Sequence, residues 1–186
     1  LHVSHDCNLR CEYCFASEGD YNCGRKLMSI ETAKKAVDYL IKNSKGRSHI
    51  EIDFFGGEPM MNFDVVKETV AYGRSLEKSI GKHFWFTTTT NGTLMNKEQI
   101  DFINENMDNV VISVDGRKEI HDKIRHDCAG NGSYDRIIPN AKELVEGRNG
   151  KSYFIRGTFT AKNKDFSNDV MHLADLGFKE ISVEPV

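Results

Sequence analysis

The sequence has little proline and tryptophan and no long run of one residue type, and these scarcities exclude several classes of protein. It contains three prolines and one tryptophan in 186 residues, and no internal repeat or low-complexity segment is present. No apolar stretch approaches the roughly 18 residues of a membrane-spanning helix. A long basic run is also missing, and 25 basic against 28 acidic side chains leave a net charge of −3. We therefore expect that the protein binds neither nucleic acid nor membranes.

Cysteine is too unevenly distributed for a disulfide-stabilised secreted protein. The five cysteines are an odd number, and three of them fall within residues 7–14, too close together to staple a fold. No signal peptide opens the sequence. These features predict a reducing, cytoplasmic location. Cys23 and Cys128 lie outside any cluster with ligand spacing, and we interpret both as ordinary loop thiols.

Strand-like and helix-like segments alternate along the chain, which at 39% hydrophobic residues can bury a core of its own. This alternation is typical of a parallel sheet with crossover helices. The expected strands cover about residues 1–5, 49–55, 83–90, 109–115, 152–160 and 179–184. The expected helices cover about residues 30–43, 63–79, 96–104, 134–147 and 165–175. Six strands and five helices predict an α/β fold whose parallel strands form most of a barrel.

Polar residues at the starts of these helices predict their boundaries. Ser29 precedes the first helix in the position of an N-cap. Asn96 and Gln99 have the spacing of a capping box. Pro139 interrupts the pattern of residues 134–147, so this helix either begins near Pro139 or kinks there.

Three cysteines, Cys7, Cys11 and Cys14, carry the main chemical signal. An electron-transferring [4Fe–4S] cluster normally takes four thiolates, so three would leave one iron free to bind a small molecule that offers an amine and a carboxylate. A structural zinc site is the alternative, because thiolates also bind zinc tetrahedrally. None of the candidate fourth ligands belongs to a second ligand pair at zinc-finger spacing. These candidates are Cys23, His2 and His5.

The Cys-x3-Cys-x2-Cys spacing, with Tyr13 just before the last cysteine, resembles the motif of the radical S-adenosylmethionine superfamily. The resemblance implies a partial (β/α)6 barrel, a [4Fe–4S] cluster on the three cysteines, and S-adenosylmethionine bound to the fourth iron. It implies that Tyr13 lies beside the adenine, with core packing as the alternative. It also implies reductive cleavage of S-adenosylmethionine to a 5′-deoxyadenosyl radical that abstracts a hydrogen, a step that needs no protein base.

Two further motifs follow expected strands, where parallel α/β proteins gather their ligand sites. The run from Gly56 through Gly57 and Glu58 to Pro59 resembles the family's GGE(P) element, which binds the methionine amino group through backbone carbonyls and the glutamate. The segment around Asn91 resembles the family's TNGT element near the cofactor. A tight turn with asparagine and glycine is the alternative for that segment.

The fourth and fifth strands contribute the remaining candidate residues. Ser113 and Asp115 point to the same side of the sheet because their side chains alternate with Val114. The resemblance assigns Ser113 to the ribose or carboxylate of the cofactor, and Asp115 either joins it or caps the following turn. Arg156 would be a costly interior charge unless it met an anion. We assign it to the methionine carboxylate, with Glu51, Asp53 or Glu184 as structural alternatives and Arg125 as the competing arginine.

Nearly the whole chain resembles the peptide-modifying branch that carries a C-terminal SPASM domain. The segments HDCNLRCEYCFASEGDY, FFGGEPMMNF and RHDCAGNGSYD are most similar to the maturases of six-cysteine SCIFF peptides, which link a cysteine sulfur to a threonine α-carbon. Anaerobic sulfatase-maturating enzymes, which oxidise serine or cysteine to formylglycine, share this core and are the alternative. A hypothesis of another class is a non-catalytic iron–sulfur or zinc module.

The resemblance also implies a domain organisation and partners. We expect residues 1–186 to be one core domain trimmed from a longer protein, with a leader-binding domain upstream and auxiliary [4Fe–4S] clusters downstream of this segment. The expected partners are a cysteine-rich precursor peptide and a ferredoxin- or flavodoxin-type electron donor, in the cytoplasm of an anaerobe.

Overall fold

The computed structural model describes residues 1–186, which form one sheet of seven strands in the order β2-β1-β3-β4-β5-β6-β7. Strand β2 is antiparallel to β1, and all other neighbours are parallel. The strands are β1 (His2–His5), β2 (Lys26–Leu27), β3 (His49–Gly56), β4 (His83–Thr90), β5 (Asn109–Ser113), β6 (Phe154–Phe159) and β7 (Ile181–Pro185). The helices are α1 (Ile30–Asn43), α2 (Phe63–Ile80), α3 (Lys97–Asn106), α4 (Lys118–Ile124), α5 (Tyr134–Glu146) and α6 (Phe166–Asp175), with 3₁₀ turns η1 (Ser17–Gly19) and η2 (Pro59–Asn62).

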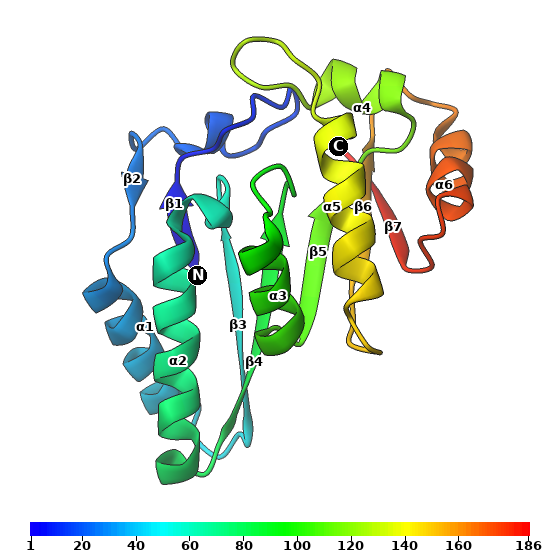
Figure 1. The fold of residues 1–186 in the computed structure, drawn as a ribbon. Coiled ribbons are helices and arrows are strands. Elements are labelled where there is room, and N and C mark those ends of the chain that lie inside the picture. The colour runs from blue at the N-terminus through cyan, green and yellow to red at the C-terminus, as the bar shows by residue number, and fades with distance from the viewer.

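Helices cover one face of the sheet, as Figure 1 shows for α1, α2, α3 and α5. The carboxyl ends of the parallel strands lie together at the top of that view, and the loops that follow them gather there. Strands β2 and β7 are the two edges of an open sheet. The predicted α/β fold with a partial barrel of six parallel strands is confirmed.

Alternation along β3 decides which face of the sheet packs against the helices. Ile50, Ile52 and Phe54 are each at most 5% exposed, whereas Glu51 and Asp53 between them are exposed. Successive side chains of a strand point to opposite faces, so the apolar set faces the core. Burying each of these side chains contributes about 1.5–3 kcal/mol. The opposite face therefore becomes the lining of the open barrel.

Side-chain caps start two of the helices as predicted. The Ser29 hydroxyl accepts a hydrogen bond from the Thr32 N–H at 3.2 Å. Asn96 and Gln99 form a complete capping box, with N···O distances of 3.0 and 3.1 Å. No helix of the chain is both long and apolar enough to cross a membrane.

The structure adds two elements that were not predicted. Strand β2 pairs only two of its residues with β1, and α4 has only seven residues; such short elements lack a readable period. Helix α5 keeps its expected range and runs through Pro139, so of the two alternatives the one in which it begins at Pro139 is wrong. Pro139 lies on the exposed side of α5, where water can satisfy the carbonyl that loses its helical donor.

Arg148 closes the end of the barrel remote from the carboxyl ends of the strands. Arg148 is 2% exposed, and its guanidinium donates to four backbone carbonyls near the end of α3 and just before β5 and β6. Burial lowers the pKa of Arg148 to about 10, which leaves it charged at neutral pH. The accepting carbonyls belong to Ile103, Met107, Asp108 and Ser152, at 2.7–3.2 Å.

Replacing this cation should destabilise the fold without touching the opposite end. Arg148→Met leaves several buried carbonyls without a donor, and we expect the free energy of unfolding to fall by about 3 kcal/mol. Lys151→Met is the matched control, because exposed Lys151 also donates to carbonyls of α3, and should cost less than about 1 kcal/mol. Urea unfolding measures both. If both variants lost the same unfolding free energy, the hydrogen bonds of Arg148 would contribute no more to stability than those of exposed Lys151.

Candidate functional site

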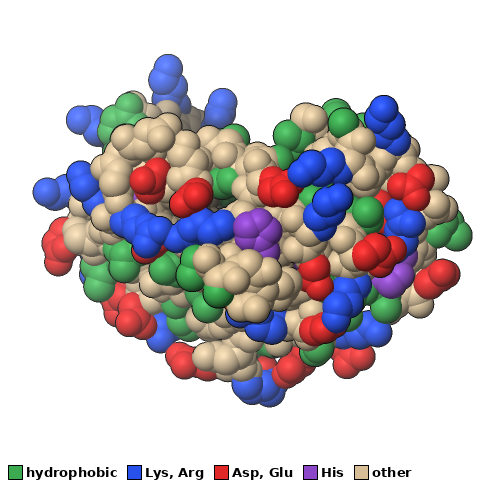
Figure 2. Space-filling model, turned by 90° about the horizontal axis from the view of Figure 1, so that it is seen from above, with side chains coloured by type: hydrophobic (Ala, Val, Ile, Leu, Met, Phe, Trp, Pro, Cys, Tyr) green, Lys and Arg blue, Asp and Glu red, His purple; other side chains and the backbone are tan.

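A cavity of about 300 Å³ lies at the carboxyl ends of the strands, beside the loop that carries the three cysteines. Figure 2, which looks onto this end of the molecule, shows a hollow in the outline and an even mixture of basic and acidic side chains. Nine of the residues predicted for the site line the cavity. They are Cys7, Cys11, Tyr13, Cys14, Gly56, Gly57, Asn91, Ser113 and Arg156.

The glycine pair after β3 positions the cysteine loop by letting two backbones approach closely. The Gly57 N–H donates to the Ser4 carbonyl and the Glu58 N–H donates to the Asp6 carbonyl, both at 2.8 Å. A Cβ atom at Gly57 would lie 2.2 Å from the Asp6 carbonyl oxygen, well inside contact distance. The bare backbone predicted to face a ligand therefore also seats the chain immediately before Cys7.

Glu58 lies beneath the cavity rather than in its wall. Its carboxylate is fully buried and accepts hydrogen bonds from Thr90 Oγ1 and Asn91 N at 2.7 Å and from Met60 N at 3.0 Å. Burial raises the pKa of Glu58, and these three donors oppose that shift. The carboxylate thus joins the ends of β3 and β4. Its predicted contact with the methionine ammonium stays a prediction.

Asn91 connects the end of β4 to the cysteine loop. Its Nδ2 atom donates to Asn8 Oδ1 at 2.9 Å and lies 3.7 Å from Cys7 Sγ. Its Oδ1 atom accepts from Thr93 N at 3.0 Å, as expected for the turn that follows β4. The turn is therefore present and aims the amide at the sulfur, and the predicted place of Asn91 near the cofactor stays a prediction.

Asp115 is the junction of three segments around the cavity. Its carboxylate, with no exposed side-chain surface, accepts from Tyr13 Oη at 2.8 Å and from Thr158 N at 3.0 Å. It also forms an ion pair with Arg125 Nε at 3.1 Å. Asp115 therefore does not cap the turn after β5. It ties the cysteine loop, the end of α4 and strand β6 together.

Burial also affects the pKa of the Tyr13 hydroxyl. Desolvation raises the pKa of Tyr13, a shift that Arg125 opposes. The hydroxyl therefore stays protonated and serves as the donor to Asp115. The ring remains part of the cavity wall, where its predicted place beside adenine stays a prediction.

A buried histidine bridges the backbones of Asp115 and Arg125. His121 Nδ1 accepts from the Asp115 N–H at 3.2 Å, so its other nitrogen carries the proton and donates to Ser133 Oγ at 2.9 Å. The Ser133 hydroxyl in turn donates to the Arg125 carbonyl at 2.8 Å. Burial lowers the pKa of His121 to about 3, which keeps the ring neutral.

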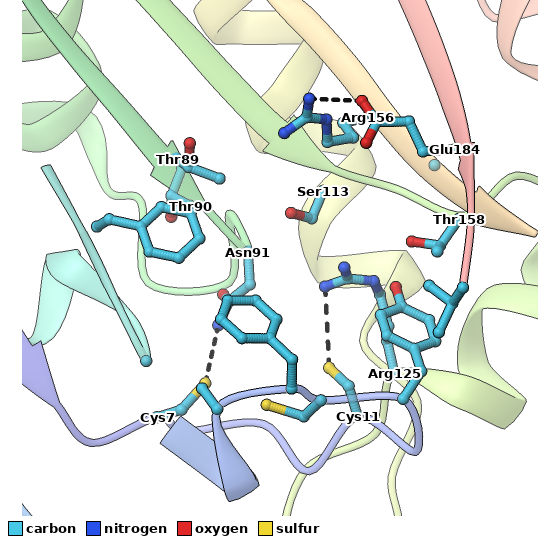
Figure 3. A pocket seen from close by; sticks show the side chains of 18 of the residues that line it. Cys7, Cys11, Thr89, Thr90, Asn91, Ser113, Arg125, Arg156, Thr158 and Glu184 are labelled. Carbon is cyan, nitrogen blue, oxygen red and sulfur yellow. Dashed lines mark hydrogen bonds and ion pairs between the residues drawn. The ribbon is translucent and has the colours of Figure 1, made fainter. Parts of the chain in front are cut away.

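Arg156 differs from the interior charge that the sequence suggested. Its side chain is 45% exposed and pairs with Glu184 Oε1 at 2.6 Å, one of the structural alternatives. Figure 3 shows this pair on the far side of the cavity from the cysteines, with Ser113 between the two. The expected interior position of Arg156 was therefore wrong, whereas its pairing with Glu184 is one of the expected alternatives. A contact with the methionine carboxylate stays a prediction for Arg156, as cofactor contact does for Ser113.

Arg125, the competing arginine, lies in the cavity beside the cysteine loop. It lines the cavity and is 9% exposed, and Nη1 lies 3.8 Å from Cys11 Sγ. Its position depends on the irregular segment between α4 and α5, which a bridge between Leu9 and Asp127 attaches to the cysteine loop. The sequence indicated Arg125 only as an alternative to Arg156 for the methionine carboxylate.

The three thiols line one cavity, and this set of donors fits a [4Fe–4S] cluster, which binds each thiolate at a different iron. Burial raises the pKa of Cys7 to about 12 and also raises that of Cys11, so ligation must displace their protons. The proposed fourth zinc ligands are engaged or exposed elsewhere: His2 and His5 pack against Tyr21 at 4.9 Å, and Cys23 is exposed.

Comparison with known proteins agrees with this geometry. Residues 1–166 match the sequence model of the Radical SAM superfamily. A cysteine-type anaerobic sulfatase-maturating enzyme of Clostridium novyi is 33% identical over 146 residues, 76% of this chain and 38% of that protein. The uncharacterized protein MJ0907 of Methanocaldococcus jannaschii is 33% identical over 190 residues, 99% of this chain and 60% of that protein.

A solved structure has the same fold. Native anSMEcpe with bound AdoMet and Kp18Cys peptide matches 98% of this chain and 49% of its own length, with a TM-score of 0.86 and 23% identity. The chain thus spans less than two thirds of each of these three proteins.

Adding one methyl group at the glycine pair should displace the cysteine loop. Gly57→Ala forces a Cβ atom against the Asp6 carbonyl, and we expect a loss of about 1–3 kcal/mol in unfolding free energy and reduced iron uptake. Gly46→Ala is the control, because a Cβ atom at Gly46 meets nothing within 4 Å. Urea unfolding and iron analysis test both. If Gly57→Ala matched the control, close backbone contact would not position the loop.

His121 should make stability depend on pH below neutrality. Its pKa is about 3 in the fold and about 6.5 unfolded, so the unfolded state binds one more proton between these values and stability is lost as pH falls through that window. We expect the slope of unfolding free energy against pH, between pH 4 and 6, to be about 1.4 kcal/mol per unit steeper in the parent than in His121→Asn. Equal slopes would contradict a buried neutral ring.

Proposed function

The chain belongs to the radical SAM superfamily, and on this premise we propose that its cavity binds a [4Fe–4S] cluster through Cys7, Cys11 and Cys14 together with S-adenosylmethionine. The observation that carries the proposal is the arrangement of three thiols along one wall of a cavity at the carboxyl ends of the strands. Together these two cofactors supply, when bound, the electron and the radical for hydrogen abstraction. The residues of this chain bind and orient the two cofactors in this proposal.

The residues around the cavity have distinct tasks in this proposal. Gly56 and Gly57 expose backbone that a ligand can approach closely, and Ser113 offers a hydroxyl in the cavity wall. Tyr13 supplies a flat ring that its bond to Asp115 holds in place. Fixed groups of this kind orient a reactant and limit side reactions by excluding water.

A peptide side chain is the substrate that we propose. The sulfatase-maturating relative of Clostridium novyi is 33% identical over three quarters of this chain, which favours oxidation of a cysteine or serine side chain to formylglycine. Nothing among the comparisons supports the thioether crosslink that the sequence resemblance placed first. We therefore rank formylglycine formation above thioether formation, and retain hydrogen abstraction as the step that both share.

The activity of the whole protein needs more than these 186 residues in this proposal. The chain covers 38% of the sulfatase-maturating relative, so peptide selection and auxiliary [4Fe–4S] clusters are assigned to segments outside it. An external one-electron donor of the ferredoxin or flavodoxin type remains the expected source of electrons.

The first test measures cleavage of S-adenosylmethionine by the reconstituted, dithionite-reduced protein. We expect 5′-deoxyadenosine from the parent and at least a hundredfold less, on the order of 3 kcal/mol or more in barrier, from Cys11→Ala. The matched controls are Cys23→Ala and Cys128→Ala, because both thiols are exposed and neither lines the cavity. Product from Cys11→Ala at the parent level would overturn the proposed cluster site.

Peptides distinguish the two substrate chemistries. Formylglycine formation from cysteine removes two hydrogens and replaces the sulfur by oxygen, whereas a thioether crosslink removes two hydrogens and keeps the sulfur. Mass spectrometry of a cysteine-containing sulfatase peptide and of a six-cysteine peptide, each incubated with the enzyme, reports which change occurs. A crosslink in the six-cysteine peptide would reverse the ranking given above.

A further inference from the structure

The cysteine sulfurs have unequal surroundings in the folded chain. Cys7 Sγ accepts from the Leu9 N–H at 3.4 Å and lies 3.7 Å from Asn91 Nδ2, and both of these donors are neutral. Cys11 Sγ instead lies 3.8 Å from Nη1 of Arg125, a permanently charged group. Figure 3 shows the guanidinium reaching the sulfur from the side of the cavity opposite Asn91.

Arg125 is fixed in this place by its side chain and by its backbone. Its Nε atom donates to Asp115 at 3.1 Å, and the guanidinium lies 5.3 Å from the centroid of the Tyr13 ring. Its backbone N–H donates to the His121 carbonyl at 2.7 Å, and its carbonyl accepts from Ser133. With a side chain only 10% exposed, Arg125 cannot swing into solvent.

Different nitrogen atoms of the guanidinium face Asp115 and Cys11. Nε faces the Asp115 carboxylate and Nη1 faces the Cys11 sulfur, so the planar group bridges them. Asp115 shares its carboxylate with Tyr13 Oη and Thr158 N. One nitrogen of the guanidinium thus lies beside the sulfur, while another is paired with the carboxylate.

We propose that Arg125 sets the reduction potential of the cluster on Cys7, Cys11 and Cys14 by holding a positive charge beside the Cys11 sulfur. The inference rests on the proposed function, because it requires that cluster. Reduction adds negative charge, which a nearby cation stabilises, so Arg125 raises the potential. The negative charge of Asp115 lowers the potential, and its carboxylate also holds the guanidinium in place. Arg125 acts on the cluster through its charge beside Cys11 and needs no contact with substrate.

Opposite shifts in two variants test this inference. The midpoint potential of the reconstituted protein is measured by electron paramagnetic resonance during a redox titration, without S-adenosylmethionine. Arg125→Gln removes the cation, and we expect its midpoint to become more negative by about the 59 mV that changes the reduced-to-oxidised ratio tenfold for one electron. Asp115→Asn removes the opposing anion, and its midpoint should become more positive.

The directions of the two shifts distinguish an electrostatic effect of Arg125 from a general loosening of the cysteine loop. If the network only holds the loop together, both variants loosen the same loop and their midpoints move in the same direction. Arg156→Gln is the matched control, because Arg156 lines the same cavity but pairs with Glu184 on its far side. Its midpoint should stay near the parent value, and a shift equal to that of Arg125→Gln would overturn the inference.

A further variant and the iron content of each protein distinguish a change in potential from a failure to bind the cluster. Arg125→Lys keeps the charge but cannot reach both partners, so its midpoint should fall between those of the parent and Arg125→Gln. If Arg125→Gln takes up no cluster, Arg125→Lys and Asp115→Asn still give opposite shifts under the proposal. A parent protein without a [4Fe–4S] cluster refutes the proposed function, whereas unchanged midpoints in loaded variants refute only the role of Arg125.

Discussion

The buried carboxylate of Asp115 is the contact on which the cavity depends. A carboxylate without exposed surface is costly unless donors surround it, and here the donors come from Tyr13, Arg125 and Thr158. Each of them belongs to a different segment, so satisfying one charge brings the cysteine loop, the end of α4 and strand β6 together. The cavity wall is therefore a consequence of neutralising this charge.

A second buried carboxylate does similar work on the other side of the cavity. Glu58 joins the ends of β3 and β4 through Thr90 and Asn91, while the glycines before it seat the chain that leads into Cys7. Polar contacts thus fix the loops at the carboxyl ends of the strands, where an apolar core cannot reach. Arg148 and apolar packing stabilise the remote end of the barrel. The loops at the carboxyl ends of the strands can therefore carry polar residues for the site.

Most of the fold was predictable because its strands and longer helices carry clear periodicities. The cavity was predictable wherever a motif follows a strand directly, as Gly57 and Asn91 do, since parallel strands end at one edge of the sheet. The roles of Arg125 and Asp115 were not, because they depend on a segment between α4 and α5 that folds back over the cysteine loop. The periodicity of a sequence indicates which face of a helix or strand is buried, but it does not indicate such tertiary contacts. Arg156 was expected as an interior charge, whereas its side chain is exposed beside Glu184 of the neighbouring strand, because the face of the sheet opposite the helices is open.

We propose that three fixed thiols leave one iron of a cluster open to S-adenosylmethionine. The decisive measurement is electron paramagnetic resonance of the reconstituted, reduced protein, recorded with and without S-adenosylmethionine. If one iron is open, the shape of the [4Fe–4S]+ signal changes when S-adenosylmethionine is added. A signal that stays the same, or a protein that holds zinc and no iron, would leave only a structural metal module.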